Sequence, residues 1–154
     1  MRRVSSVVLA VSALFAATPV LAEEAAAPTC GRTVQEIADG FIPLFYEQGK
    51  VREAYEAFVA RDYKQHNPNA TDGRDAAIAF LEPFYERNPG HQMVVHRVLV
   101  EAPYIVVHLH GFSNPDDRGA AAVDILRVEN CWIVEHWDVT QPVPERSMNA
   151  NGMF

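Results

Sequence analysis

The spacing of apolar residues divides the chain into a helical first half and a strand-rich second half. In the first half, apolar side chains recur at intervals of three and four residues, which is typical of amphipathic helices. The predicted helices cover residues 33–49, 51–60 and 75–87. Thr33 and Glu36 have the spacing of a capping box at the start of the first helix. Pro43 is expected to kink this helix and Gly49 to end it.

The second half is rich in β-branched and aromatic residues, in segments bounded by Pro, Gly, Asn or Asp. The predicted strands cover residues 93–100, 104–112, 120–129 and 132–140, after a short extended piece at 63–66. Asn130-Cys131 is the predicted turn between the last two strands. Three helices followed by a four-strand meander predict an α+β fold, with the helices packed on a curved antiparallel sheet. We expect a cone-shaped α+β barrel with an interior pocket.

The first 22 residues have the pattern of a secretory signal. Arg2 and Arg3 are followed by a short apolar run, and Val20 and Ala22 stand where a signal peptidase reads small or neutral residues. The alternative is a membrane anchor, but the apolar run is short for one and ends at Thr18-Pro19. The predicted organisation is a signal peptide at 1–22, a flexible leader at 23–32, a domain at 33–144 and a C-terminal tail at 145–154.

Charge and cysteine content narrow the function classes further. The 154 residues include 13 basic and 20 acidic ones, and removing residues 1–22 takes away two arginines and no acid. This acidic balance disfavours a nucleic-acid partner, and no later segment is apolar for long enough to span a bilayer. The mature chain is therefore expected to be exported, and periplasmic in a Gram-negative host. In an oxidising compartment, Cys30 and Cys131 are expected to form a disulfide.

Histidines and carboxylates gather in the strand half. His108 and His110 are two residues apart on one predicted strand and therefore share a face, as do His136 and Asp138 on another. Asp124 stands among apolar residues, where a solvated carboxylate is unexpected. Burying several ionisable groups costs free energy unless they are paired or functional.

Regular pairing of the last two strands about the Asn130-Cys131 turn would separate the two aspartates. It would place Asp138 opposite Val123, and Asp124 opposite Trp137 on the other side of the sheet. A β-bulge would change this register. The residues alone therefore leave open whether Asp124 and Asp138 share one pocket.

Two chemistries fit these side chains. One is cofactor-free acid–base catalysis on a carbon acid, with a carboxylate or imidazole as base in a dry apolar pocket. The other is a metal site in which His108 and His110 act with His66, His136 or Asp138. There is no Gly-rich phosphate loop, no Gly-x-Ser-x-Gly motif and no His-Glu-x-x-His motif.

Several segments resemble the SnoaL-like family of the nuclear transport factor 2-like superfamily. Residues 63–68 (YKQHNP) with Asp72-Gly73 are similar to its Y-x-Q-H-N-P … D-G segment, and residues 106–110 to its central strand. Residues 123–129 and 133–139 are similar to its closing hairpin, although Cys131 stands where the family usually has glycine. The resemblance runs from about Thr33 to Pro144.

The resemblance implies a cone of three helices and a curved sheet, often dimeric through the sheet, with cyclase members that catalyse an aldol condensation without a cofactor. It implies Asp138 or Asp124 as the catalytic acid–base group, and we favour Asp138 with His66 and His108 placing the substrate oxygen. The predicted pocket residues are Tyr63, Phe84, Tyr104, His110, His136 and Trp137.

We therefore expect an exported catalyst of aldol condensation, cyclisation or isomerisation on a small hydrophobic carbonyl compound, with neither a cofactor nor a metal. The alternatives are a non-catalytic small-molecule-binding module of the same fold and a histidine-based metal-binding protein. The apolar content of strands 93–140 predicts a homodimer through the sheet.

Overall fold

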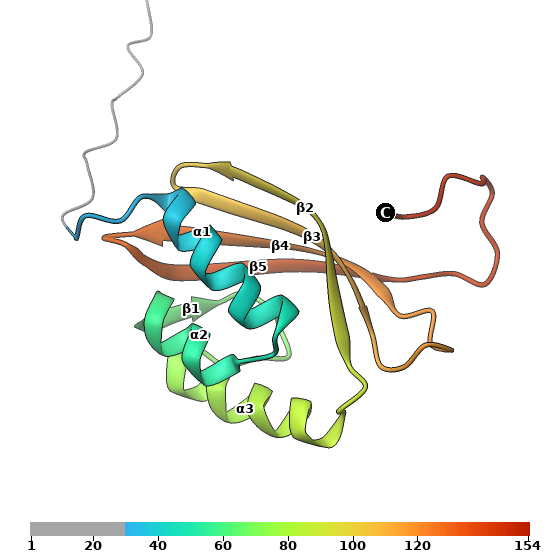
Figure 1. Ribbon diagram of the computed structural model, residues 1–154, viewed down its shortest axis with the longest axis horizontal. Coiled ribbons are helices and arrows are strands. Elements are labelled where there is room, and N and C mark those ends of the chain that lie inside the picture. The colour runs from blue at the N-terminus through green and yellow to red at the C-terminus, as the bar shows by residue number, and fades with distance from the viewer. Residues whose placement is uncertain (1–29) are drawn as a thin grey trace, which may run out of the picture.

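Three α-helices and a five-stranded sheet make up the part of the chain that the computed structural model describes, residues 30–154 (Figure 1). The elements are α1 (Val34–Ile42), η1 (Pro43–Glu47), α2 (Val51–Phe58), β1 (Val59–Gln65), α3 (Arg74–Arg87), β2 (Gln92–Glu101), β3 (Tyr104–Phe112), β4 (Ala120–Glu129) and β5 (Trp132–Pro142). The predicted signal segment 1–22 and leader residues 23–29 lie outside the described residues. No helix among residues 30–154 is long and apolar enough to cross a membrane.

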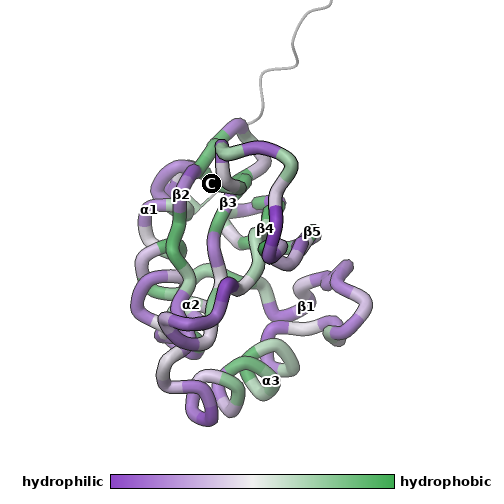
Figure 2. The backbone as a smooth tube through the Cα atoms, turned by 90° about the vertical axis from the view of Figure 1, so that its right-hand side faces the viewer, coloured by the Kyte–Doolittle hydropathy of each residue, from purple (hydrophilic) through white to green (hydrophobic). Residues whose placement is uncertain are grey.

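The strands lie in the order β1-β5-β4-β3-β2, and Figure 2 shows β2 to β5 following one another across the sheet. This confirms the predicted α+β plan of three helices on a curved sheet, with two corrections. The sheet is mixed and not antiparallel, because the short piece predicted at 63–66 is part of β1, which pairs in parallel with β5. The sheet is also open between its edge strands β1 and β2, so the barrel is not closed.

The first helix begins where the sequence predicts, and its hydrogen-bond pattern changes at Pro43. The Thr33 hydroxyl accepts a hydrogen bond from the Glu36 amide, and the Glu36 carboxylate accepts one from the Thr33 amide, which completes the capping box. At Pro43 the helix widens into the π-helical turn η1, in which the Gln48 amide donates to the Pro43 carbonyl. Within this turn, the side chains of Phe45 and Tyr46 are both buried.

The hydrophobic core lies between the helices and one face of the sheet. The side chains with least exposure come from both layers, so the helices are held by burial of apolar surface. They include Ile37, Ala54, Val59, Ile105, Val107 and Ile133. Four aromatic rings, those of Phe41, Phe45, Tyr46 and Tyr55, pack against one another within this core.

The expected disulfide is present between Cys30 and Cys131, with their Cα atoms 6.1 Å apart. Cys131 lies in the turn between β4 and β5, where Asn130 and Cys131 both have positive φ, as a two-residue hairpin turn requires. The bond therefore joins the residues that precede α1 to the closing hairpin. Arg32 strengthens the same junction, because its guanidinium donates to the Cys131 carbonyl.

Candidate active site

A cavity of about 200 Å³ lies between the helices and the sheet. Most of its wall is apolar, with aromatic side chains from the first helical segment, α2, β1 and α3. These include Phe41, Phe45, Tyr46, Tyr55, Tyr63 and Phe84. Such a wall favours flat, apolar ligands and excludes water from any polar group that projects into it.

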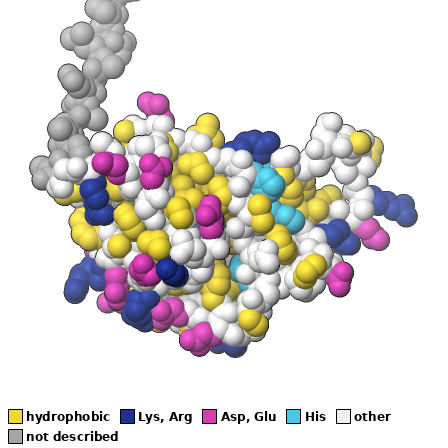
Figure 3. All heavy atoms as spheres, viewed as in Figure 1, with side chains coloured by type: hydrophobic (Ala, Val, Ile, Leu, Met, Phe, Trp, Pro, Cys, Tyr) yellow, Lys and Arg dark blue, Asp and Glu magenta, His cyan; other side chains and the backbone are white. Residues whose placement is uncertain are grey.

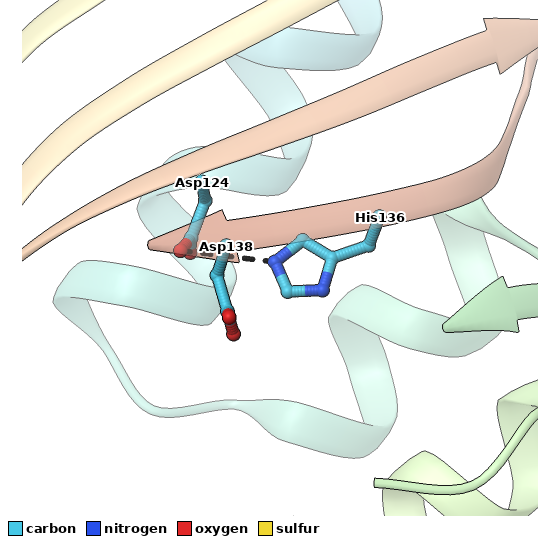
Figure 4. Close-up of side chains that lie close together, drawn as sticks. All are labelled: Asp124, His136 and Asp138. Carbon is cyan, nitrogen blue, oxygen red and sulfur yellow. Dashed lines mark ion pairs between the residues drawn. The ribbon is translucent and has the colours of Figure 1, made fainter. Parts of the chain in front are cut away.

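Three polar side chains, Asp124, His136 and Asp138, gather at one side of this cavity. Asp124 projects from β4, and His136 and Asp138 project from β5 (Figure 4). One ligand atom from each lies within 4.8 Å of the others. Asp124 Oδ1 and His136 Nε2 are 3.7 Å apart, and both side chains are largely shielded from solvent. Two carboxylates and an imidazole therefore share one apolar space.

A β-bulge at Val134 brings the two aspartates to the same face. Arg127 pairs with Glu135 while Val128 pairs with Ile133, so Val134 is an extra residue in β5. The regular alternation predicted from the sequence is reversed beyond this point, and Asp138 pairs directly with Asp124 instead of Val123. The structure thus settles the register that the sequence left open.

The hydrogen bonds of His136 define its tautomer. Its Nδ1 lies 2.8 Å from the Gln65 side-chain oxygen, while the Gln65 amide nitrogen donates to the Tyr63 hydroxyl. The same Gln65 oxygen also accepts from the Asn67 backbone amide, so it is an acceptor in both contacts. Nδ1 of His136 must therefore carry a proton, and in the neutral ring Nε2 is the basic nitrogen facing Asp124.

The two carboxylates are held by different donors. The Tyr46 hydroxyl donates to Asp124 Oδ2 at 2.7 Å, and the Asn67 side-chain amide donates to Asp138 Oδ2 at 2.6 Å. The Asn67 orientation is set because its oxygen accepts from the Asn69 amide. Among the described residues, no protein donor forms a hydrogen bond with Asp138 Oδ1, so this atom is free to act on a ligand.

The tyrosines of the cavity stay protonated over the ordinary pH range. Burial raises the pKa of Tyr46, Tyr55 and Tyr63 well above the usual value, and the negative charge of Asp124 adds to the effect. The same two causes raise the pKa of Tyr85 to about 12. These hydroxyls are therefore hydrogen-bond donors and not bases near neutral pH.

A family model for the SnoaL-like domain matches residues 44–136, a stretch that contains Asp124, His136 and most of the cavity wall. This match covers more than half of the chain. The chain belongs to the SnoaL-like family.

Solved structures agree with this assignment at the level of the fold. A candidate ketosteroid isomerase from Kribbella flavida is 19% identical over 75% of this chain and 83% of its own, with a TM-score of 0.60. A candidate polyketide cyclase from Bacillus cereus is 21% identical over 70% and 73%, with a TM-score of 0.57. A nuclear transport factor 2-like protein of unknown function from Cytophaga hutchinsonii is 15% identical over 71% and 91%, also at 0.57. A search of curated proteins found no match.

The SnoaL-like cavity contains half of the residues predicted for it. Asp124, Asp138, His136, Tyr63 and Phe84 line the cavity.

The prediction was wrong for His66 and Trp137. Both lie on the outer face of the sheet, because the bulge at Val134 reverses the alternation of β5 and because His66 follows the inward-facing Gln65. Their rings stack at 4.7 Å, and His66 Nε2 lies 2.8 Å from the Glu135 carboxylate. His66 is therefore not among the residues that line the cavity.

The prediction was also wrong for Tyr104, His108 and His110. On β3 they alternate with the buried Ile105, Val107 and Leu109, so they face outward. The rings of His96, His108 and His110 each stack with the ring of Phe154 at the C-terminal end. Figure 3 shows histidine side chains beside hydrophobic ones on one face of the molecule.

This arrangement also corrects the predicted metal site. The outward-facing His108 and His110 cannot share an ion with the inward-facing His136 and Asp138. Within the described residues, the group that offers metal-ligand atoms close together is Asp124, His136 and Asp138.

Several cavity residues were not predicted, namely Tyr46, Gln65, Asn67, Tyr85 and His91. Gln65 and Asn67 stand in the YKQHNP segment, so the segment that carried the family resemblance also marked them. Nothing in the sequence marked Tyr46 as a cavity residue, because a tyrosine on the apolar face of a helix looks the same as a residue of the hydrophobic core. Its orientation depends on the π-helical turn η1.

Proposed function

We propose that the cavity is the active site of a cofactor-independent acid–base catalyst, which promotes aldol-type cyclisation or isomerisation of a small hydrophobic carbonyl compound. The observation that carries this proposal is the convergence of Asp124, His136 and Asp138 in a mostly apolar cavity. Both reactions begin with removal of a proton from the carbon beside a carbonyl group, which needs a base in a dry site. The neighbours described as a candidate polyketide cyclase and a candidate ketosteroid isomerase support the same class of chemistry.

Asp138 is the proposed base. Its Oδ2 is held by Asn67, and its Oδ1 is left to accept the proton from the substrate carbon. The electron pair of the broken C–H bond moves into the carbonyl group and forms an enolate. The same proton, now on Asp138, can return to a different carbon in an isomerisation, or to the new alkoxide after carbon–carbon bond formation in an aldol step.

His136 and Asp124 lie beside Asp138 and assist the proton transfer. Gln65 holds His136 with Nε2 toward the carboxylates, so the ring can take up or release a proton beside them. The hydrogen bond from Tyr46 orients Asp124 beside Nε2 of His136. The pair can therefore balance the charge that changes when Asp138 is protonated.

The test uses deuterium exchange at carbon, since the natural substrate is unidentified. Wild-type protein in D₂O is incubated with 2-indanone or 2-tetralone, and loss of the α-proton signal is followed by NMR. We expect faster exchange with wild type than with buffer alone, and a loss of about 10²–10⁴-fold in the Asp138→Asn variant. Asp62→Asn, which changes an exposed aspartate on β1, is the matched control.

A different result would favour the binding module. If wild-type protein exchanges neither ketone, and mass spectrometry finds an apolar molecule retained through purification, the cavity stores or carries that ligand. Equal exchange by Asp138→Asn and Asp62→Asn would contradict the role of Asp138.

We also propose that the chain is exported through its first 22 residues. The disulfide between Cys30 and Cys131 supports this, because such bonds persist mainly in oxidising compartments. Mass spectrometry of the protein released from the periplasm of a Gram-negative expression host should find Glu23 as the first residue. Retention of Met1 would contradict export by this route.

A homodimer through the outer face of the sheet is the proposed assembly. The large exposed apolar side chains of this face include Leu99, Tyr104 and Val139. Light scattering at micromolar concentration should give twice the monomer mass, and Leu99→Glu with Val139→Glu should give the monomer mass. A monomeric wild-type protein would contradict the proposal.

A further inference from the structure

Two residues of the cavity wall each carry a polar atom that has no hydrogen-bond partner in the protein. These atoms are the Tyr85 hydroxyl and His91 Nδ1, and both atoms are buried. A buried polar atom without a partner costs about 1–3 kcal/mol, and such atoms are uncommon in folded proteins. Two of them on the wall of one cavity point to a ligand group that they bind.

The local structure holds both side chains in place. The Asn88 amide caps the end of α3 by donating to the Phe84 and Tyr85 carbonyls, and the His91 amide donates to the Asn88 carbonyl. This turn brings the His91 ring to 5.4 Å from the ring of Tyr85 and 4.9 Å from that of Phe84. The subsite is therefore preorganised.

Gly49 also lies close to the Tyr85 ring. It has a φ of +62°, and a Cβ atom built on it would lie 3.1 Å from the ring. A larger residue at this position would press on Tyr85, which would have little room to move. The Tyr85 ring is thus in contact with Phe84, His91 and Gly49, which limit its movement.

The protonation states of the two groups define what they can bind. Tyr85 is a donor, since its pKa is raised to about 12. Burial lowers the pKa of His91, although the charge of Asp117 opposes this, so the ring is neutral at neutral pH. A phenol donor beside a neutral imidazole suits an uncharged acceptor oxygen better than a carboxylate, because Asp124 and Asp138 already place negative charge on the same cavity.

The subsite lies apart from the carboxylates in the fold. Asp124 and Asp138 project from β4 and β5, whereas Tyr85 and His91 flank the turn between α3 and the edge strand β2. In the sheet, β3 separates β2 from β4. A ligand that contacts both groups therefore touches the wall formed by β4 and β5 and the wall beside β2.

We propose that Tyr85 Oη and His91 Nδ1 form a second polar subsite, which binds an uncharged carbonyl oxygen of the ligand. Tyr85 donates to one lone pair of this oxygen and the Nδ1–H tautomer of His91 donates to the other. Where the proposed function holds, the substrate carries this oxygen in addition to the reacting carbonyl beside Asp138. It is then a small, flat dicarbonyl compound.

The test compares two probes of similar shape, 1-indanone and indane, by calorimetry. The indanone oxygen only accepts hydrogen bonds, so ionised Asp124 and Asp138 cannot bind it, and the affinity ratio of the two probes reports the donors. We expect wild type to prefer indanone, and Tyr85→Phe to reduce the ratio about fivefold. Tyr63→Phe is the matched control, because its hydroxyl lines the same cavity but is already bonded to Gln65.

A spectroscopic signature supports the assignment independently. The carbonyl stretch of bound indanone should move to lower frequency in wild type and in Tyr63→Phe, and should return toward its apolar-solvent value in Tyr85→Phe. Tyr85→Phe should also leave the thermal stability of the ligand-free protein unchanged or slightly higher, since it removes an unpartnered hydroxyl.

Two outcomes would overturn the proposal. One is an unchanged affinity ratio and carbonyl frequency in Tyr85→Phe, which would mean that water satisfies the hydroxyl. The other is no preference for indanone over indane in wild type. Neither outcome depends on turnover, so failure of the subsite is separable from failure of Asp138 as the base.

Discussion

Asp124 and Asp138 are direct partners across β4 and β5, and their side chains enter the cavity from the same face of the sheet. Two carboxylates side by side repel each other unless protons or donors intervene. Here Tyr46 donates to one, Asn67 donates to the other, and His136 lies beside them. Each of these neighbours is a point at which the account can be tested.

Tyr46→Phe should destabilise the protein by about 1–3 kcal/mol, because it removes the donor to a shielded carboxylate oxygen of Asp124. Urea denaturation followed by circular dichroism measures the change. Tyr104→Phe is the matched control, since the Tyr104 side chain is exposed on the outer face and should lose less than about 0.5 kcal/mol. Equal effects of the two substitutions would contradict the assigned role of Tyr46.

Removal of the disulfide should destabilise the protein more than Tyr46→Phe does. The bond links residues 101 positions apart, so Cys30→Ser with Cys131→Ser should lower the free energy of unfolding by about 2–4 kcal/mol. Denaturant titration of the variant and of reduced wild type should give similar midpoints. In oxidised wild type, thiol titration under denaturing conditions should find no reactive cysteine, and finding two would refute the bond.

The free energy of unfolding should fall at alkaline pH, because the buried tyrosines ionise more readily in the unfolded chain than in the folded one. Their pKa is higher in the folded than in the unfolded chain, where it is about 10, so the folded state holds protons that the unfolded state releases. The stability that these protonated tyrosines give the folded state is fully present below about pH 10 and declines as the pH rises further.

Tyr63→Phe removes one of these groups and tests this directly. Between pH 8 and pH 11 the variant should lose about 1 kcal/mol less than wild type, measured by denaturant unfolding at each pH. A loss as steep as that of wild type would show that Tyr63 does not hold its proton in the folded state.

The sequence predicts most of the fold because local signals agree with the tertiary structure. The Thr33–Glu36 capping box and the Asn130-Cys131 turn both occur where their residue types predict them, and the α-helix ends at Pro43. The parallel pairing of β1 with β5 was missed, since it joins segments far apart in the chain and only the last residues of β1 were recognised as extended.

The candidate site was predicted in part, and a β-bulge explains the difference on β5. Strand alternation assigns faces only while the register is regular, and the extra residue Val134 reverses the faces of β5 beyond it. The reversal turns Trp137 outward and places Asp138 on the same face as Asp124. The sequence was enough to favour Asp138 as the acid–base group. Its pairing with Asp124 could not be predicted, because it depends on the bulge at Val134.

The measurement that tests the central claim most directly is the rate of α-proton exchange in Asp138→Asn against Asp124→Asn, with the same ketone and pH. If Asp138 is the base, its substitution lowers the rate about 10²–10⁴-fold, while Asp124→Asn, which removes a supporting charge, lowers it less. The double variant should then be no slower than Asp138→Asn alone. The opposite order, with Asp124→Asn slower and Asp138→Asn near wild type, would contradict the account and make Asp124 the base.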